Sequence, residues 1–186
     1  LGYNAMTDTT SGQDNTAVGF GSLGNNTTAS NNTAVGRSAL SANTTGYNNA
    51  ALGSGAASGL TTGGDNVAVG FNTMLGTVTG NENTAIGNDS LKALTTGNNN
   101  VAAGANALAA NTTGTNNVAI GESAALAATT STGNVIIGQD AVKTGTFVGF
   151  NNVVIGKLAG EDLTSADANV IIGEDAGKNQ TTADNN

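Results

Sequence analysis

The sequence has no cysteine, proline, histidine or tryptophan, and only 3% of its 186 residues are aromatic. Without histidine and cysteine, the common pairings of a nucleophile with a base cannot be built, so we do not expect an enzyme. The absence of cysteine also leaves no indication of the redox compartment. With so few aromatic residues, an ordinary globular core of large side chains is not expected.

Basic residues are scarce as well. The chain carries five lysines and arginines against 13 aspartates and glutamates, for a net charge of −8. Because phosphate contacts need basic side chains, we expect no nucleic-acid partner, and anionic lipid is disfavoured for the same reason. No apolar run approaches the roughly 20 residues that span a bilayer, so we expect no membrane insertion in this segment.

A strict repeat of 17 residues occupies almost the whole chain. Each unit contains a glycine and, four residues before it, an asparagine. The pairs are Asn15 and Gly19, Asn32 and Gly36, Asn49 and Gly53, Asn66 and Gly70, Asn83 and Gly87, Asn100 and Gly104, Asn117 and Gly121, Asn134 and Gly138, Asn152 and Gly156, Asn169 and Gly173. A fixed short period over so many units indicates one small structural unit stacked on itself.

The unit is typical of short strands rather than helices. It follows approximately N-[T/V]-A-[V/I]-G-x-x-[A/S]-L-x-x-x-T-T-G-x-N, with two apolar segments such as Thr84–Ile86 and Ala107–Leu108. Thr and Val favour pleated backbone, and Gly inside a helix costs about 1 kcal/mol relative to Ala. The hairpin dipeptide Asn-Gly occurs nowhere. We therefore predict an all-β fold, a parallel β-solenoid of about eleven 17-residue coils in which each strand pairs with its equivalent in the next coil.

The recurring glycine and asparagine both have structural interpretations. The glycine follows each strand and indicates a turn with positive φ, or a corner without room for Cβ. The asparagines would stack in register, and side-chain amides in such a stack can hydrogen-bond along it. We predict that both columns serve as turn and ladder residues.

Alternation along the strand predicts which side chains fill the coil. Residues one and three places before each glycine share a face, and we expect this face to point inward. The predicted coil core is Val18, Val35, Leu52, Val69, Ile86, Ile120, Ile137, Ile155 and Ile172. The residue between them points to the other side and is apolar too: Ala17, Ala34, Ala51, Ala68, Ala85, Ala102, Ala119, Ile136, Val154 and Ile171.

A strand that is apolar on both faces is buried on both faces. A narrow solenoid buries only its inner face, so the outer one needs another surface. A second copy of the same chain is the simplest candidate. We therefore predict that the middle residues of the strands form a subunit interface.

The repeat resembles two families of fibrous proteins. The steps Asn32–Gly36, Asn117–Gly121 and Asn134–Gly138 resemble the head repeats of trimeric autotransporter adhesins. The longer unit, with its N-T-T-G-x-N-N turn, is still more similar to the repeat arrays of bacteriophage tail fibres. The resemblance covers nearly the full chain. The 17-residue unit is longer than that of autotransporters, and residues 1–186 include neither the membrane anchor of autotransporters nor the chaperone domain of some phage fibres.

The resemblance implies a left-handed β-roll in each chain and a homotrimer, so the partners would be two further copies of this chain. It also implies an extracellular location, on a virion tail fibre or a bacterial cell surface, and contact with a glycan or protein receptor. Both origins stay open. Residues 1–186 would form one solenoid domain with a one-residue irregularity between 139 and 155. The repeat is already under way at Leu1, which favours a fragment of a longer fibrous protein.

Three other features admit alternatives. The Thr pairs, such as Thr44 and Thr45, either satisfy turn backbone or form a flat array that matches ice. Aromatic residues at the surface, among them Phe20, Tyr47 and Phe71, either pack at coil corners or stack on sugars. Carboxylates concentrate toward the C-terminus and form a solvated acidic face or a weak Ca²⁺ site.

No cofactor, metal or catalytic residue is predicted. Residues Gly19–Gly24 match G-x-G-x-x-G, but turn residues follow them instead of the helix that nucleotide binding requires. We expect a structural and adhesive segment of a trimeric extracellular fibre that provides rigid spacing and receptor contact. The alternative function is that of a monomeric solenoid that binds ice or another surface.

Overall fold

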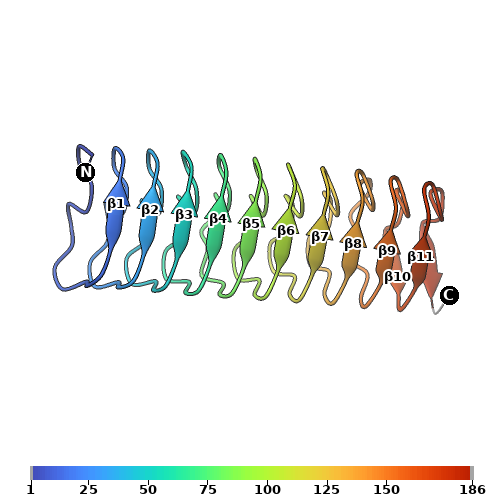
Figure 1. The fold of residues 1–186 in the computed structure, drawn as a ribbon. Coiled ribbons are helices and arrows are strands. Elements are labelled where there is room, and N and C mark those ends of the chain that lie inside the picture. The colour runs from blue at the N-terminus through green and yellow to red at the C-terminus, as the bar shows by residue number, and fades with distance from the viewer. Residues whose placement is uncertain (1, 185–186) are drawn as a thin grey trace.

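Each 17-residue unit forms one coil of a parallel β-solenoid in the computed structural model, which describes residues 2–184. These residues contain no helix, and the coils follow one another in a row (Figure 1). One sheet holds ten strands, which we call the front sheet. Its strands are β1 (Thr16–Val18), β2 (Thr33–Val35), β3 (Ala50–Leu52), β4 (Val67–Val69), β5 (Thr84–Ile86), β6 (Val101–Ala103), β7 (Val118–Ile120), β8 (Val135–Ile137), β9 (Val153–Ile155) and β11 (Val170–Ile172).

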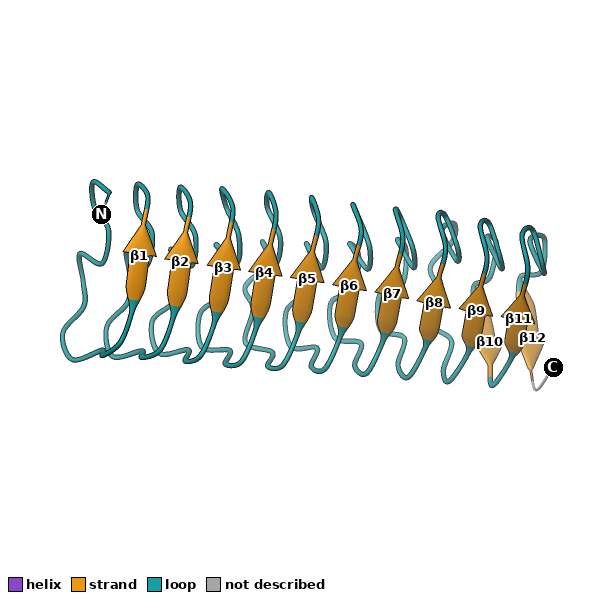
Figure 2. Ribbon diagram, in the orientation of Figure 1, coloured by secondary structure: helices purple, strands orange, loops and turns teal. Residues whose placement is uncertain are grey.

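The front sheet confirms the predicted parallel pairing. Ala17 pairs with Ala34, and every later strand aligns its middle residue with the middle residue of the next coil. The ten strands are one fewer than the predicted number of coils. Two further strands, β10 (Ser165–Asp167) and β12 (Thr182–Asp184), pair in parallel behind β9 and β11 (Figure 2).

The second apolar segment of the unit forms turns rather than a strand in every coil of residues 2–184. Around Leu40 the chain makes consecutive turns, in which the N–H of Ala39 donates to the carbonyl of Gly36 and that of Ser41 to Ser38. Ser38 and Leu40 have φ of 58° and 50°, which non-glycine residues adopt infrequently. The turns place Leu40 inside the coil, where it is fully buried. Tertiary burial thus overrides the backbone preference of Leu.

The recurring glycine has both of the properties predicted for it. From Gly19 to Gly173 its φ lies between 125° and 145°, which L side chains rarely adopt. A Cβ on Gly104 would also lie 2.3 Å from the carbonyl oxygen of Gly121 in the next coil. We call these residues the corner glycines.

The asparagine column forms the predicted ladder of amides. The Oδ1 atom of Asn83 accepts two hydrogen bonds from Asn100, one from the backbone N–H at 3.0 Å and one from Nδ2 at 3.0 Å. Asn100 in turn accepts both bonds from Asn117, and its Nδ2 also donates to the carbonyl of Gly114 at 2.8 Å. From Asn32 to Asn169 these ladder asparagines are buried. Each side chain therefore fixes the position of the next coil.

The predicted orientation of the strands is wrong. The residues predicted as the coil core face outward: Val18, Leu52, Ile86, Ile120 and Ile172 are exposed, and Val35, Val69, Ile137 and Ile155 are half-buried. The residues predicted as a subunit interface are buried in the core: Ala17, Ala34, Ala51, Ala68, Ala85, Ala102, Ala119, Ile136, Val154 and Ile171. The reason is that the middle residue lies two places after the ladder asparagine and so points to the same side.

Side chains from opposite sides of the coil share a narrow core. In the early coils an Ala in the strand is matched by a large residue four places after the corner glycine, such as Leu23, Leu40 or Leu108. In the last two coils the large residue is in the strand, as Val154 and Ile171, and the small residue, Gly160 or Gly177, is in the turn. A Cβ on Gly160 would contact Val154, and one on Gly177 would lie 3.4 Å from Ile171. In these coils a small residue on one side of the core is matched by a larger one on the other, as a close-packed interior requires.

The coil with the extra residue accommodates Phe147. The front-sheet register shifts by 18 residues there, so that Ile136 pairs with Val154, and Phe147 forms a bridge with Ala128 on the opposite side of the coil. Phe147 is fully buried. A Cβ on Gly149 would lie 2.7 Å from its ring. The predicted local change of shape is thus present, and it places an aromatic ring inside the coil.

Replacing a central ladder residue tests the ladder. We expect Asn100→Ala to lower the free energy of unfolding by about 1–3 kcal/mol, because it leaves the buried N–H of Asn117 without an acceptor and removes one of the two amide donors to the carbonyl of Gly114. Chemical denaturation measures the change. The exposed Thr113→Ala serves as the control and should stay within about 0.5 kcal/mol of the wild type. Equal effects of the two substitutions would contradict the ladder.

A double-mutant cycle tests the orientation of the strand. Ala102→Ile should cost about 1–3 kcal/mol by overpacking, and Leu108→Ala about 2–5 kcal/mol by leaving a cavity. Both residues are fully buried. In the double variant the added volume fills the cavity, so we expect its cost to fall below the sum by at least about 0.5 kcal/mol. Strict additivity would show that the two positions do not face each other.

Candidate functional surfaces

The outer side of the front sheet is an apolar surface, which we call the front face. It consists of the first and third residues of strands β1–β9 and β11, and every one is Val, Ile, Leu, Ala or Thr. Leu52 is 53% exposed, Ile86 45% and Ile120 41%. The prediction that the strand is apolar on both faces is therefore confirmed, although the inner and outer residues are exchanged.

The front face is long and uninterrupted by charge. At about 4.8 Å per coil and about 7 Å between alternate residues of a strand, it covers roughly 330 Å². Contiguous apolar patches of this size on a single chain are often sites of association. The exposed aromatic rings of Phe20 and Phe71 follow their corner glycines directly and extend the apolar surface at one edge.

The opposite side of the coil, which we call the back side, is polar. It comprises the turn Asn43–Tyr47 and its equivalents. The first threonine of each pair is half-buried and donates to a carbonyl of the next coil, as Thr44 Oγ1 does to Thr61 at 3.2 Å. The second points outward, and seven successive coils expose Thr28, Thr45, Thr62, Thr79, Thr96, Thr113 and Thr130. One hydroxyl of each pair thus satisfies backbone, while the other faces solvent.

Charge is divided between the two edges of the solenoid. All five basic residues lie one or five places after a corner glycine, on what we call the turn edge: Arg37, Lys92, Lys143, Lys157 and Lys178. Carboxylates accompany them there, and Lys143 pairs with Asp140 at 2.9 Å. The hydrogen bond with Asp140 raises the pKa of Lys143, as the bond with Asp175 raises the pKa of Lys178.

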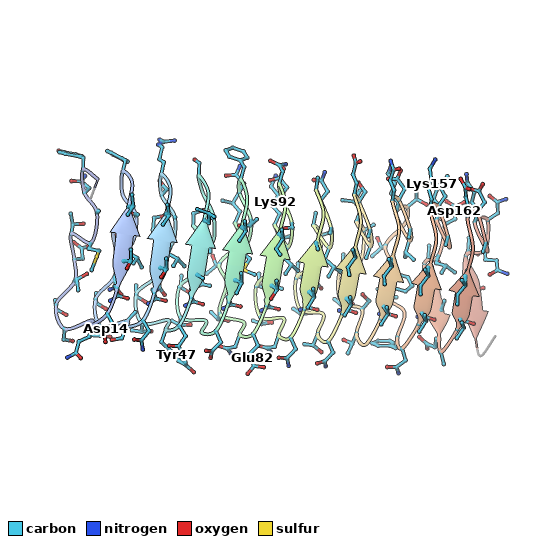
Figure 3. All side chains as sticks on the ribbon, in the orientation of Figure 1. Asp14, Tyr47, Glu82, Lys92, Lys157 and Asp162 are labelled. Carbon is cyan, nitrogen blue, oxygen red and sulfur yellow. The ribbon has the colours of Figure 1, made fainter. Side chains whose placement is uncertain are left out.

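The other edge, beside the ladder asparagines, is acidic, and we call it the asparagine edge. Asp14, Asp65 and Glu82 each directly precede a ladder asparagine, and Asp167 precedes one by two residues. None of the basic residues of the sequence lies at these positions. Figure 3 shows Asp14, Tyr47 and Glu82 along this edge and Lys92, Lys157 and Asp162 along the turn edge.

The predicted surface aromatics occupy different environments. Phe20 is 49% exposed and stacks on Tyr3, with ring centroids 5.8 Å apart. Tyr47 is 51% exposed and lies on the back side near the asparagine edge. Phe147, by contrast, belongs to the core. The sequence therefore predicts that Tyr47 is exposed, but it does not reveal that the ring lies against Gly64 in the next coil.

Residues 2–184 contain no group of three or more acidic, cysteine or histidine side chains that could hold a metal ion. The C-terminal carboxylates thus form no preassembled Ca²⁺ site within this range. Residues Gly19–Gly24, which match the nucleotide motif, form a corner and two turns. Among the described residues, none forms a helix with the length and hydrophobicity needed to cross a bilayer.

Comparison with protein-family models, with curated proteins and with solved structures finds no match to this chain. The function is therefore inferred from three of the four surfaces of the solenoid: the apolar front face, the threonine-bearing back side and the acidic asparagine edge.

Proposed function

We propose that this chain is a structural and adhesive segment of a trimeric extracellular fibre. Three parallel copies pack through their front faces, and the fibre gives rigid spacing and contacts a receptor along its outer surface. The segment has no catalytic role. The observation that carries the proposal is the uncharged apolar front face, which a single chain leaves in water.

A further copy of the same chain suits the front face because the surface is periodic. Its apolar side chains recur once per coil, at the strand spacing of about 4.8 Å. A partner with the same period can place side chains between these rows along the whole length. A globular partner would match only a few coils. Parallel copies related by rotation also keep identical coils at the same height.

The interior of the solenoid supports a role in rigid spacing. The amide ladder and the strand pairing join each coil directly to the next, so neighbouring coils are held in a fixed arrangement. The resemblance of the repeat to phage tail-fibre arrays and adhesin heads favours a place outside the cell, on a virion or a bacterial surface. Both locations are consistent with a protease-resistant spacer.

The oligomeric state tests the proposal. In sedimentation equilibrium the wild-type protein should have three times the 18.0 kDa mass of one chain. The double variant Ile86→Lys, Ile120→Lys should sediment as a single folded chain, because two charges per chain would be buried in the interface. Circular dichroism checks that its fold is retained.

The matched control is Thr96→Lys, Thr130→Lys, which adds the same charges to the same two coils on the back side. We expect it to remain trimeric. A wild-type protein that stays a single chain at all concentrations would refute the proposal, as would loss of assembly in the control alone.

The exposed threonines favour one second candidate, a monomeric solenoid that binds ice. Seven hydroxyls in successive coils form a straight row. The row is one residue wide, whereas an ice-matching surface is expected to be broader. Under the fibre proposal the purified protein produces no thermal hysteresis, and Thr79→Val, Thr96→Val leaves the freezing behaviour unchanged. Hysteresis that this variant abolishes would select the ice-binding candidate.

A further inference from the structure

Tyr47 is held flat against the solenoid by a glycine in the next coil. An ideal Cβ on Gly64 would lie 2.9 Å from Cζ and 3.0 Å from Cε2 of the tyrosine ring. Gly64 is buried although it occupies an outward position, because the ring covers it. One face of the ring therefore rests on backbone, and Tyr47 remains 51% exposed. Any other residue at position 64 would displace the ring.

The residues that directly follow Tyr47 and Gly64 in the chain are polar. Asn48 Nδ2 donates to Asp65 Oδ1 at 2.9 Å, which orients the carboxylate of the residue that directly follows Gly64. Asn81 Oδ1 accepts the N–H of Gly64 at 2.7 Å and so fixes the backbone under the ring. Thr45, two residues before Tyr47, adds an exposed hydroxyl on the same outer side. The second oxygen of Asp65 is left to accept a hydrogen bond from a ligand.

This combination matches the surface of a sugar ring. A pyranose with axial C–H groups presents an apolar face that stacks on an aromatic ring, while its hydroxyls point sideways and donate to carboxylates or amides. A flat peptide or a nucleobase could also stack. A nucleic acid would bring phosphates to an edge with carboxylates and no basic residue, which disfavours it.

The negative charge of the asparagine edge limits which kinds of glycan can bind. Asp65 and Glu82 lie in adjacent coils, and Asp14 lies further along the same edge. Sulfated, phosphorylated or carboxylated glycans would be repelled there. An uncharged glycan meets no such penalty.

We propose that Tyr47, Asp65 and Thr45 form a binding site for an uncharged pyranose glycan, with the ring of Tyr47 as the stacking platform. The site deepens the receptor contact of the proposed function and rests on it for its biological role. It lies away from the front face, so glycan binding does not require a particular oligomeric state.

The chain itself provides the reporter for the test. It has no tryptophan, and Tyr3 and Tyr47 are its only tyrosines, so Tyr3→Phe leaves Tyr47 as the sole fluorescent residue of this class. Titration of this variant with cellohexaose and with chitohexaose should give a saturable change in tyrosine emission for at least one of them. Hexagalacturonate, which is anionic, should give none.

Calorimetry on variants with Tyr3 intact separates stacking from non-specific effects. Tyr47→Ala should weaken binding of the responding hexaose at least about tenfold, and Tyr47→Trp should retain it. Tyr3→Ala, which removes another exposed ring, is the matched control and should bind like the wild type. The proposal is overturned if neither neutral hexaose binds, if hexagalacturonate binds equally well, or if Tyr47→Ala has no effect.

The same titration on Ile86→Lys, Ile120→Lys distinguishes this site from the proposed assembly. If a single chain binds the hexaose, the glycan site is supported even if the trimer proposal is refuted. If a trimer binds no hexaose, the glycan site is refuted and the fibre proposal stands.

Discussion

The buried amide ladder is the constraint on which the rest of the solenoid depends. Each ladder asparagine uses its oxygen and its nitrogen on neighbouring coils, so the coils can stack only in one register and at one distance. A buried amide with these bonds is stable, whereas one without them would be costly. The corner glycine is required by the same stacking, because consecutive coils approach too closely there for a Cβ.

The ladder also decides which side of each strand faces outward. Side chains alternate along a strand, so the residue two places after a buried asparagine is also buried. That position is Ala in most coils, and the space is completed by Leu or Met from the turns. The larger Val and Ile residues are left on the front face. An apolar outer surface is therefore a consequence of the internal hydrogen bonds, and it is the basis for the proposed assembly.

The architecture could be predicted from the sequence, but the placement of side chains could not be predicted from size alone. The period, the absence of Asn-Gly and the Thr–Val content gave the parallel solenoid, the corner glycines and the ladder. Choosing the core by residue size gave the wrong face. The signal that could have corrected it was present, since Asn100 and Ala102 are two residues apart. The left-handed turns around Leu40 and the seating of Tyr47 on Gly64 involve contacts between coils, which no local pattern reveals.

Amide hydrogen exchange of the asparagine side chains, followed by NMR on ¹⁵N-labelled protein, tests the central claim most directly. The carboxamide protons of the buried ladder asparagines, such as Asn83, Asn100 and Asn117, should exchange far more slowly than those of exposed asparagines such as Asn25 and Asn99. Equally fast exchange in the two groups would show that the ladder is not a buried, hydrogen-bonded column, and the account of the fold and its outer surfaces would then be contradicted.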